Sequence, residues 1–164
     1  MFSTVVAHAA VAALLSGTMW YLPSASAEPD SSINGTYAAL SDGLWAKTNE
    51  RFHDEVTVVS IWTISSSCSD YEDCTGTVVS DQGWSAPVRY RSGLWRLTRT
   101  IPHWQTCPDG TTAPGEQAFE FSRASRNGSP STLTGFDRTK GPSGACGVNQ
   151  WLTISMPFSL TLIS

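Results

Sequence analysis

Residues 152–162 read LTISMPFSLTL, and this stretch decides the fold class. Its apolar side chains fall on every second position from Leu152 to Leu162, and mostly small polar residues separate them. Successive side chains of a β-strand point to opposite faces of the sheet, so a period of two held this long predicts a half-buried strand. Because proline cannot donate a hydrogen bond to a neighbouring strand, we expect a bulge at Pro157 or an edge position for the whole strand.

The chain from residue 33 onwards has the same character. Residues 56–64 are rich in β-branched side chains and apolar on both faces, which predicts a central strand. A short polar turn joins it to the run at 74–79, and Ser92-Gly93 joins two later runs, so two hairpins are predicted. The predicted strands are 35–40, 56–64, 74–79, 87–91, 94–98, 116–122, 131–136 and 152–162. A weaker pattern predicts a short helix over 44–52.

Short strands at roughly even spacing, joined by local hairpins, are typical of β-barrels and β-sandwiches. We expect a single all-β domain over 33–164 with two disulfides. An up-and-down barrel of the calycin type, as in lipocalins, is favoured over a sandwich. The opening Gly35-Thr36-Tyr37 is similar to the glycine-x-aromatic start of lipocalins.

The N-terminus has the pattern of an export signal. Residues 5–22 contain no Asp, Glu, Lys or Arg, and small residues follow at Ala25 and Ala27. Signal peptidases accept small side chains at these two positions, so we expect a signal peptide over 1–27, cleavage after Ala27 and a short linker over 28–32. No Lys or Arg precedes the apolar run and His8 lies inside it, which leaves a retained N-terminal anchor as the alternative.

Charge and composition exclude two classes of partner. The formal net charge is −4, and a mildly acidic chain with scattered arginines lacks the basic footprint of a nucleic-acid-binding protein. No segment after residue 27 is apolar for long enough to cross a membrane as a helix. We therefore expect a secreted, extracytoplasmic protein with no membrane span after cleavage.

The cysteines all follow the predicted signal, and an even number in an exported chain predicts disulfides. They are Cys68, Cys74, Cys107 and Cys146. Three pairings are possible. We favour Cys68–Cys74, whose partners flank a short polar turn between two predicted strand ends, together with Cys107–Cys146. A metal site is the alternative, but the chain has no C-x-x-C motif and neither His53 nor His103 has ligand spacing to the cysteines.

No arrangement of residues predicts catalysis. The chain has no G-x-S-x-G motif, and His53 and Asp54 are adjacent, so they would point to opposite faces of a strand. His103 is interpreted as part of a loop beside a disulfide. Acidic residues cluster at 50–55, 70–73 and 116–120, where carboxylates are usually solvated. We expect no catalytic residue, no bound metal and no cofactor, and hence not an enzyme.

Tryptophan is the most unusual feature of the composition, with six of the seven after residue 27. Trp62 and Trp95 lie inside predicted strands, and we expect them in the core. Trp84 and Trp104 lie in predicted loops, so they are the candidate ligand-binding residues. Four arginines flank one predicted hairpin and form a possible patch for an anionic headgroup or glycan. They are Arg89, Arg91, Arg96 and Arg99.

The cysteines and tryptophans belong to longer motifs. These are WTISSSC at 62–68, CTGTV at 74–78, GLW at 93–95, WQTCPDG at 104–110, LTG at 133–135, GAC at 144–146 and MPFS at 156–159. Together they resemble a family of small exported, uncharacterised, disulfide-containing β proteins of mycobacteria and their relatives, across essentially the whole mature domain. The resemblance implies export, the same disulfide pairing and a calycin-like fold, and it implies no reaction.

Three functions follow as hypotheses. The first is a non-enzymatic protein that holds an apolar or amphipathic molecule of the cell envelope, such as a lipid, inside the barrel. The second is an extracellular module that binds a glycan or a protein through exposed aromatic side chains. The third, least favoured, is a small hydrolase that uses a carboxylate pair.

Overall fold

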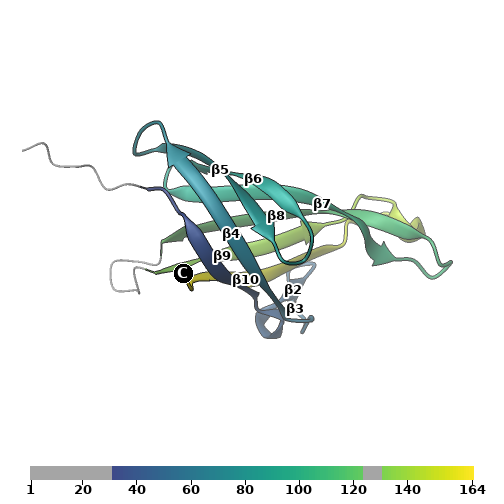
Figure 1. The fold of residues 1–164 in the computed structure, drawn as a ribbon. Coiled ribbons are helices and arrows are strands. Elements are labelled where there is room, and N and C mark those ends of the chain that lie inside the picture. The colour runs from purple at the N-terminus through teal and green to yellow at the C-terminus, as the bar shows by residue number, and fades with distance from the viewer. Residues whose placement is uncertain (1–30, 124–130) are drawn as a thin grey trace, which may run out of the picture.

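A computed structural model describes residues 31–123 and 131–164 of the chain. Within these residues eight antiparallel strands close a barrel, and two short strands extend it on one side (Figure 1). The expected all-β barrel is therefore confirmed. The expected signal peptide over 1–27 and its cleavage after Ala27 lie outside the described residues, as does most of the linker.

The chain winds up and down between neighbouring strands. Its elements are β1 (Gly35–Ser41), η1 (Gly43–Trp45), β2 (Lys47–Thr48), β3 (Arg51–Phe52), β4 (Val58–Cys68), β5 (Asp73–Ser80), β6 (Ser85–Arg91), β7 (Leu94–Thr106), β8 (Thr112–Arg123), β9 (Thr132–Lys140), η2 (Ala145–Gly147) and β10 (Thr153–Leu162). The sheet runs β1-β4-β5-β6-β7-β8-β9-β10, and pairing of β10 with β1 closes it. The β2–β3 hairpin is attached to β10.

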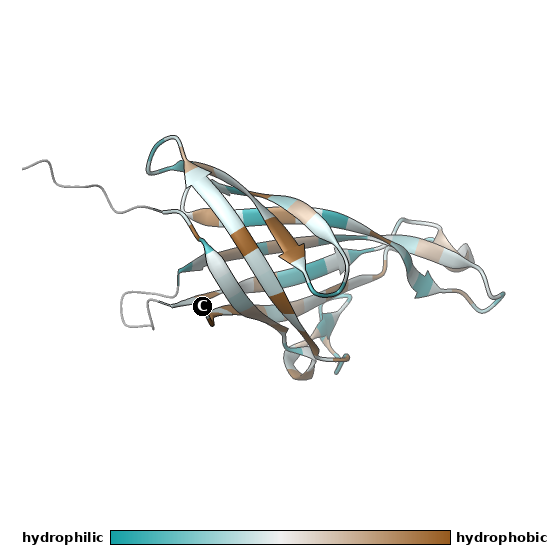
Figure 2. Ribbon diagram, viewed as in Figure 1, coloured by the Kyte–Doolittle hydropathy of each residue, from teal (hydrophilic) through white to brown (hydrophobic). Residues whose placement is uncertain are grey.

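Alternating side chains explain why these segments form a barrel. Figure 2 shows hydrophobic and hydrophilic residues following one another as bands along the strands. In β8, for example, Phe119 and Phe121 are buried and Glu120 between them is exposed. Burial of one face of every strand removes apolar area from water, which is the main favourable term in folding. In β4, which we expected to be buried on both faces, Val59 and Ile61 point outwards and are exposed.

Pro157 lies inside the sheet, so the expected edge position of its strand is wrong. β10 pairs with β9 along its whole length. On its other side it pairs with β2 up to Ser155 and with β1 from Phe158 onwards. The carbonyl oxygen of Pro157 accepts a hydrogen bond from the Asp42 N–H at 2.9 Å on that side. The nitrogen of a strand residue faces the same neighbouring strand as its carbonyl oxygen. The N–H that Pro157 lacks would therefore point between the end of β2 and the end of β1, where no strand pairs with β10.

The helix expected over 44–52 is wrong beyond its first turn. Only η1 is helical there, and β2 and β3 form a two-residue hairpin. Asn49 and Glu50 have φ of 48° and 66°, as a type I′ hairpin turn requires at both central positions. Asn49 also exchanges hydrogen bonds with Thr153 in β10, donating from its N–H at 2.8 Å and accepting at Oδ1 at 2.9 Å. Pairing with β10 therefore overrides a weak local preference.

Both expected disulfides are present. Cys68 and Cys74 are directly opposite each other at the β4–β5 turn, with their Cα atoms 3.9 Å apart. Cys107 and Cys146 have Cα atoms 5.0 Å apart. The second bond links Cys107, in the turn of the long β7–β8 hairpin, to Cys146, in the β9–β10 connection over 141–152. We call the end of this hairpin and this connection, which extend beyond the rest of the barrel in Figure 1, the arm.

Candidate functional site

The interior of the barrel is filled by aromatic side chains. Trp62, at 1% exposure, lies at its centre. Its ring centroid is 5.0 Å from that of Phe119, 5.2 Å from that of Phe158 and 5.3 Å from that of Trp84. These distances and the tilted or edge-on angles are those of close aromatic packing. Packed rings therefore surround Trp62, and the hypothesis of an apolar ligand held inside the barrel stays a prediction.

A buried polar network lies between this core and the arm. Asp137, at 1% exposure, accepts hydrogen bonds from Ser41 Oγ at 2.7 Å and from Gln117 Nε2 at 2.9 and 3.0 Å. Gln117 Oε1 in turn accepts from Arg99 Nε at 2.6 Å. Burial raises the pKa of Asp137 above its ordinary value, and the two hydrogen bonds and the attraction of Arg99 oppose that rise. The network joins β1, β7, β8 and β9, so it fixes the shape of this end of the barrel.

Asp137 should make stability depend on pH. Its pKa is higher in the folded than in the unfolded chain, so the folded state holds the proton more strongly. Stability should fall as pH rises from the unfolded value, near 3.8, through the raised folded value. We expect wild type to lose stability relative to Asp137→Asn as the pH rises above about 3.8, measured by denaturant unfolding. Other carboxylates titrate equally in both proteins, so a difference that stays constant with pH would contradict the expectation.

Trp84, one of the two tryptophans expected to contact a ligand, is half-buried at the rim of the core. It makes an edge contact with Trp62, and the guanidinium of Arg99 lies 4.3 Å from its ring centroid. Trp84 lies in the β5–β6 turn, and its ring thus packs between side chains of β4 and β7. This position gives its ring a packing role.

Trp104, the other expected ligand contact, lies in β7 together with His103, so the loop expected at both residues is wrong. The Trp104 side chain packs inside the arm. A Cβ atom added at Gly115 would lie 2.7 Å from Cγ and Cδ2 of Trp104, and one at Gly141 would lie 3.1 Å from Cζ3. The indole therefore rests directly on two glycines that leave room for it. Gly115 belongs to the inward-facing set of β8 with Gln117 and Phe119, so the Trp104 ring lies on the inner side of the arm.

The remaining sequence candidates are not brought together. His53 Nδ1 lies 3.2 Å from Glu55 Oε1, and His103 Nδ1 lies 2.8 Å from Thr112 Oγ1. Asp70 Oδ1 accepts two backbone N–H groups and shapes the β4–β5 turn. Over 31–123 and 131–164, no group of three His, Cys, Asp or Glu side chains converges on a possible metal position. No helix in the same residues has the length and apolarity to span a bilayer.

The four expected arginines separate. Arg99 points into the barrel, and the other three line an open pocket over β6 and β7. Arg96 pairs with Glu120 at 3.0 Å, and Arg91 lies 3.5 Å from Asp73. Two of these cations are therefore already neutralised by carboxylates of the chain.

A different outer surface gathers exposed aromatic and basic side chains. It covers the outward face of β9 and β10, the β2–β3 hairpin beside them and the start of β8. We call it the aromatic–basic face, defined by Trp45, Lys47, Phe52, Phe136, Arg138, Lys140 and Trp151. Its four aromatic side chains are 53% to 72% exposed. Large aromatic side chains left in water at such density mark interaction surfaces.

The register of the sheet explains how this face is assembled. Phe136, Arg138 and Lys140 occupy alternate positions of β9, so all three point outwards. Arg138 is directly opposite Ser155 in β10, and Ser155 is opposite Lys47 in β2. Phe136 is opposite Pro157. The β2–β3 hairpin thus continues the rows of side chains that β9 begins.

A first pocket, of about 380 Å³, lies at the hairpin end of the face. Three aromatic rings contribute to it, together with Pro157 and three charged side chains. Its lining is Trp45, Lys47, Glu50, Phe52, Phe136, Arg138, Ser155 and Pro157. The Nζ atom of Lys47 lies 5.0 Å from the centroid of the Phe52 ring, so the amine and the ring face the same space.

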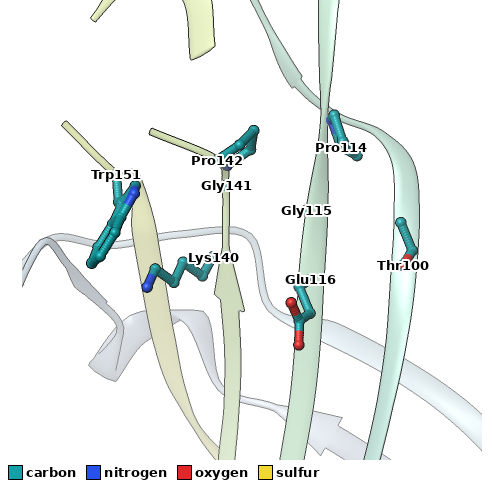
Figure 3. Close-up of a pocket in the computed structure, with 8 residues that line it drawn as sticks. All are labelled: Thr100, Pro114, Gly115, Glu116, Lys140, Gly141, Pro142 and Trp151. Atoms are coloured by element: carbon teal, nitrogen blue, oxygen red, sulfur yellow. The ribbon is translucent and has the colours of Figure 1, made fainter. Parts of the chain in front are cut away.

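A second pocket, also of about 380 Å³, adjoins the arm (Figure 3). Lys140 is directly opposite Glu116 in β8 and Thr153 in β10. Its Nζ atom lies 3.3 Å from the centroid of the Trp151 ring, and Figure 3 shows the two side chains beside each other. Lys140 lies one outward position beyond Arg138 on β9, so the two pockets are neighbours on one surface.

The three cations of the face form no ion pair with a carboxylate among the residues that the structure describes. In the part of the chain that the structure describes, the ion pairs are His53–Glu55, Arg91–Asp73 and Arg96–Glu120. Lys47, Arg138 and Lys140 are in none of them. Glu50 and Glu116 line the pockets and are likewise outside these pairs. The face therefore offers charged groups and aromatic rings that no described ion pair uses.

Sequence reasoning missed this face, although part of its signal was present. Phe136 stands three residues from Leu133 and Trp151 stands one residue from Leu152, so both are out of phase with the buried set of their strands. That phase marks them as outward-facing. Trp45 and Phe52 gave no such signal, because the segment between them was read as helical.

The comparisons with known proteins support the fold. The sensor domain of PknI from M. tuberculosis, in a monomer form, matches this chain with a TM-score of 0.59 at 13% sequence identity. The match covers 80% of this chain and 88% of that chain. At this identity the likeness shows the fold alone. No protein-family model and no curated protein matches the sequence. The neighbour is mycobacterial, and membership in the expected family of small exported proteins stays a prediction.

Proposed function

We propose that this chain is a non-enzymatic recognition module that acts outside the cytoplasm and binds its partner through the aromatic–basic face. The observation that carries the proposal is the contrast between a packed interior and an outer surface with four exposed aromatic side chains. An interaction site on a barrel with a filled interior has to lie on its outside.

Three further observations support this proposal. Two disulfides are typical of proteins that fold in an oxidising compartment. The N-terminal sequence has the pattern of a signal peptide cleaved after Ala27. The structural neighbour is named as a sensor domain, and sensing requires recognition without turnover. Export would leave the barrel, preceded by a short linker, in the medium or at the cell envelope.

Retention on the host's cell-envelope fraction tests the proposal. We expect wild type to be retained, and Trp45→Ala and Trp151→Ala each to weaken retention by about tenfold, because exposed aromatic anchors often contribute more than 1 kcal/mol. Both residues are exposed, so the variants should remain folded.

The matched control is Tyr71→Ala. Tyr71 is an aromatic residue of similar exposure in the β4–β5 turn, at a distance along the sheet from this face. Retention that is equal in wild type, both tryptophan variants and the control would refute the proposal, and so would catalytic turnover of an envelope component.

A further inference from the structure

We infer that the ligand of the aromatic–basic face is an anionic polysaccharide that spans both pockets. This inference rests on the proposed function and names the chemical class of its ligand. It follows from the combination of ring faces, unpaired cations and unpaired carboxylates on one broad, open surface.

The aromatic rings favour sugars over lipids. A lipid chain requires a deep apolar cavity, and both pockets are open and lined by charged side chains. A pyranose ring has a flat face of C–H groups, which packs against the electron-rich face of an indole or phenyl ring. Trp45 at one pocket provides such a platform, and so do the faces of Phe52 and Trp151 opposite the ones that Lys47 and Lys140 cover.

The cations of the face indicate that the ligand carries negative charge. Arg138 and Lys47 lie in one row with Ser155 between them, so they approach the same stretch of ligand from β9 and β2. Neither forms one of the ion pairs found in the described residues. A guanidinium binds a carboxylate or sulfate through two parallel hydrogen bonds, and Arg138 is free to do so.

The carboxylates argue against a densely charged ligand. Glu50 faces the first pocket and Glu116 the second, so each pocket offers an acceptor beside its cations. A polyphosphate or nucleic-acid backbone would be repelled by both. Sugar hydroxyl groups are donors and would satisfy them, and the overall charge of −4 also disfavours a polyanion held by charge alone.

The extent of the face predicts an extended ligand. The two pockets are adjacent along β9, and the face crosses five neighbouring strands from β3 to β8. Strands lie about 4.8 Å apart, so the surface is roughly 20 Å across. A ligand that reaches from Trp45 to Trp151 therefore has several sugar units.

Binding to defined polymers tests the inference. The anionic polysaccharide probes are polygalacturonate, alginate and hyaluronate. Fully methyl-esterified polygalacturonate is the control that keeps the sugar but has no charge. Polyphosphate is the control that has negative charge but no sugar. We expect at least one anionic polysaccharide to bind at least about tenfold more tightly than the other two kinds of probe. Equal binding of the methyl ester would show a neutral-glycan site, and equal or tighter binding of polyphosphate would show simple charge attraction. Either result overturns the inference.

Substitutions then locate the contact. Arg138→Gln should weaken binding of the preferred polysaccharide by about tenfold and reduce its dependence on salt, since one charge contact is lost. Arg89→Gln, the same change at an exposed arginine over β6, should leave binding unchanged. Equal effects of the two changes would also overturn the inference.

The result also separates this inference from the proposed function. If none of the three anionic polysaccharides binds while retention on the envelope fraction still depends on Trp45 and Trp151, the ligand class is wrong and the proposed function stands. If that retention is independent of both tryptophans, the proposed function itself fails.

Discussion

Trp62→Ala should lower the free energy of unfolding by about 4 kcal/mol, and so lower the melting temperature by more than about 10 °C. Trp62 is fully buried and contacts three other aromatic rings at centroid distances of 5.0 to 5.3 Å. Alanine would remove the largest side chain at the centre of the barrel and leave a cavity that the surrounding strands cannot close. Denaturant unfolding with circular dichroism measures the change.

The matched control is Trp45→Ala, which makes the same chemical change at an exposed site. It should alter the free energy of unfolding by less than about 0.5 kcal/mol while weakening binding. The two variants thus separate a tryptophan that stabilises the fold from one that contacts a partner. Similar losses of stability in both would show that the η1 tryptophan is part of the core, and would undermine the assignment of the aromatic–basic face.

The fold was readable from the sequence because most strands alternate cleanly. β10 and β8 follow a period of two, and each has one buried face as expected. The β2–β3 hairpin was not readable, because its turn uses Asn49 and Glu50 rather than glycine, and its strands are held by β10. The expected edge position of β10 is wrong for a related reason. Proline indeed donates no hydrogen bond to a neighbouring strand, but β10 changes its neighbour from β2 to β1 at Pro157.

The candidate site was harder to read than the fold. The sequence predicts loops at Trp84 and Trp104, but only Trp84 lies in one, because β7 continues to Thr106. A position in a loop also does not decide which way a side chain points. Trp84 turns inwards to Trp62, and Trp104 lies on Gly115. The face assembles residues from η1, β2, β3, β9 and the β9–β10 connection. That arrangement depends on the pairing of β10 with β2, which no local pattern in the sequence reveals.

The filled interior has a consequence for how this barrel can work. Calycin-type barrels that carry ligands leave space between their inward side chains. Here a cluster of buried aromatic and aliphatic side chains lies in the interior, and the Asp137 network is buried as well. Such an interior makes the barrel a rigid support, and the side chains available for recognition are those on its outer surface.

Loss of the Cys107–Cys146 bond, by changing both residues to serine, should destabilise the domain by up to about 4 kcal/mol. The two cysteines are 39 residues apart, so the bond restricts a long loop of the unfolded chain. Serine substitution of Cys68 and Cys74, which are six residues apart, is the control and should lower stability by about 2.4 kcal/mol. Thermal unfolding of the two double variants measures the difference, and a larger loss in the control would contradict it.

The same bond should matter for binding at one pocket and not at the other. Cys146 lies in the β9–β10 connection, which also holds Pro142 and Trp151 of the pocket beside the arm. Breaking the bond frees this connection, whereas Trp45 and Phe52 lie in η1 and β3, outside the connection. In the folded Cys107→Ser, Cys146→Ser protein, Trp151→Ala should therefore have little further effect, and Trp45→Ala should still weaken binding about tenfold. If Trp151→Ala keeps its full effect there, the arm does not position that pocket, and the disulfide acts on stability alone.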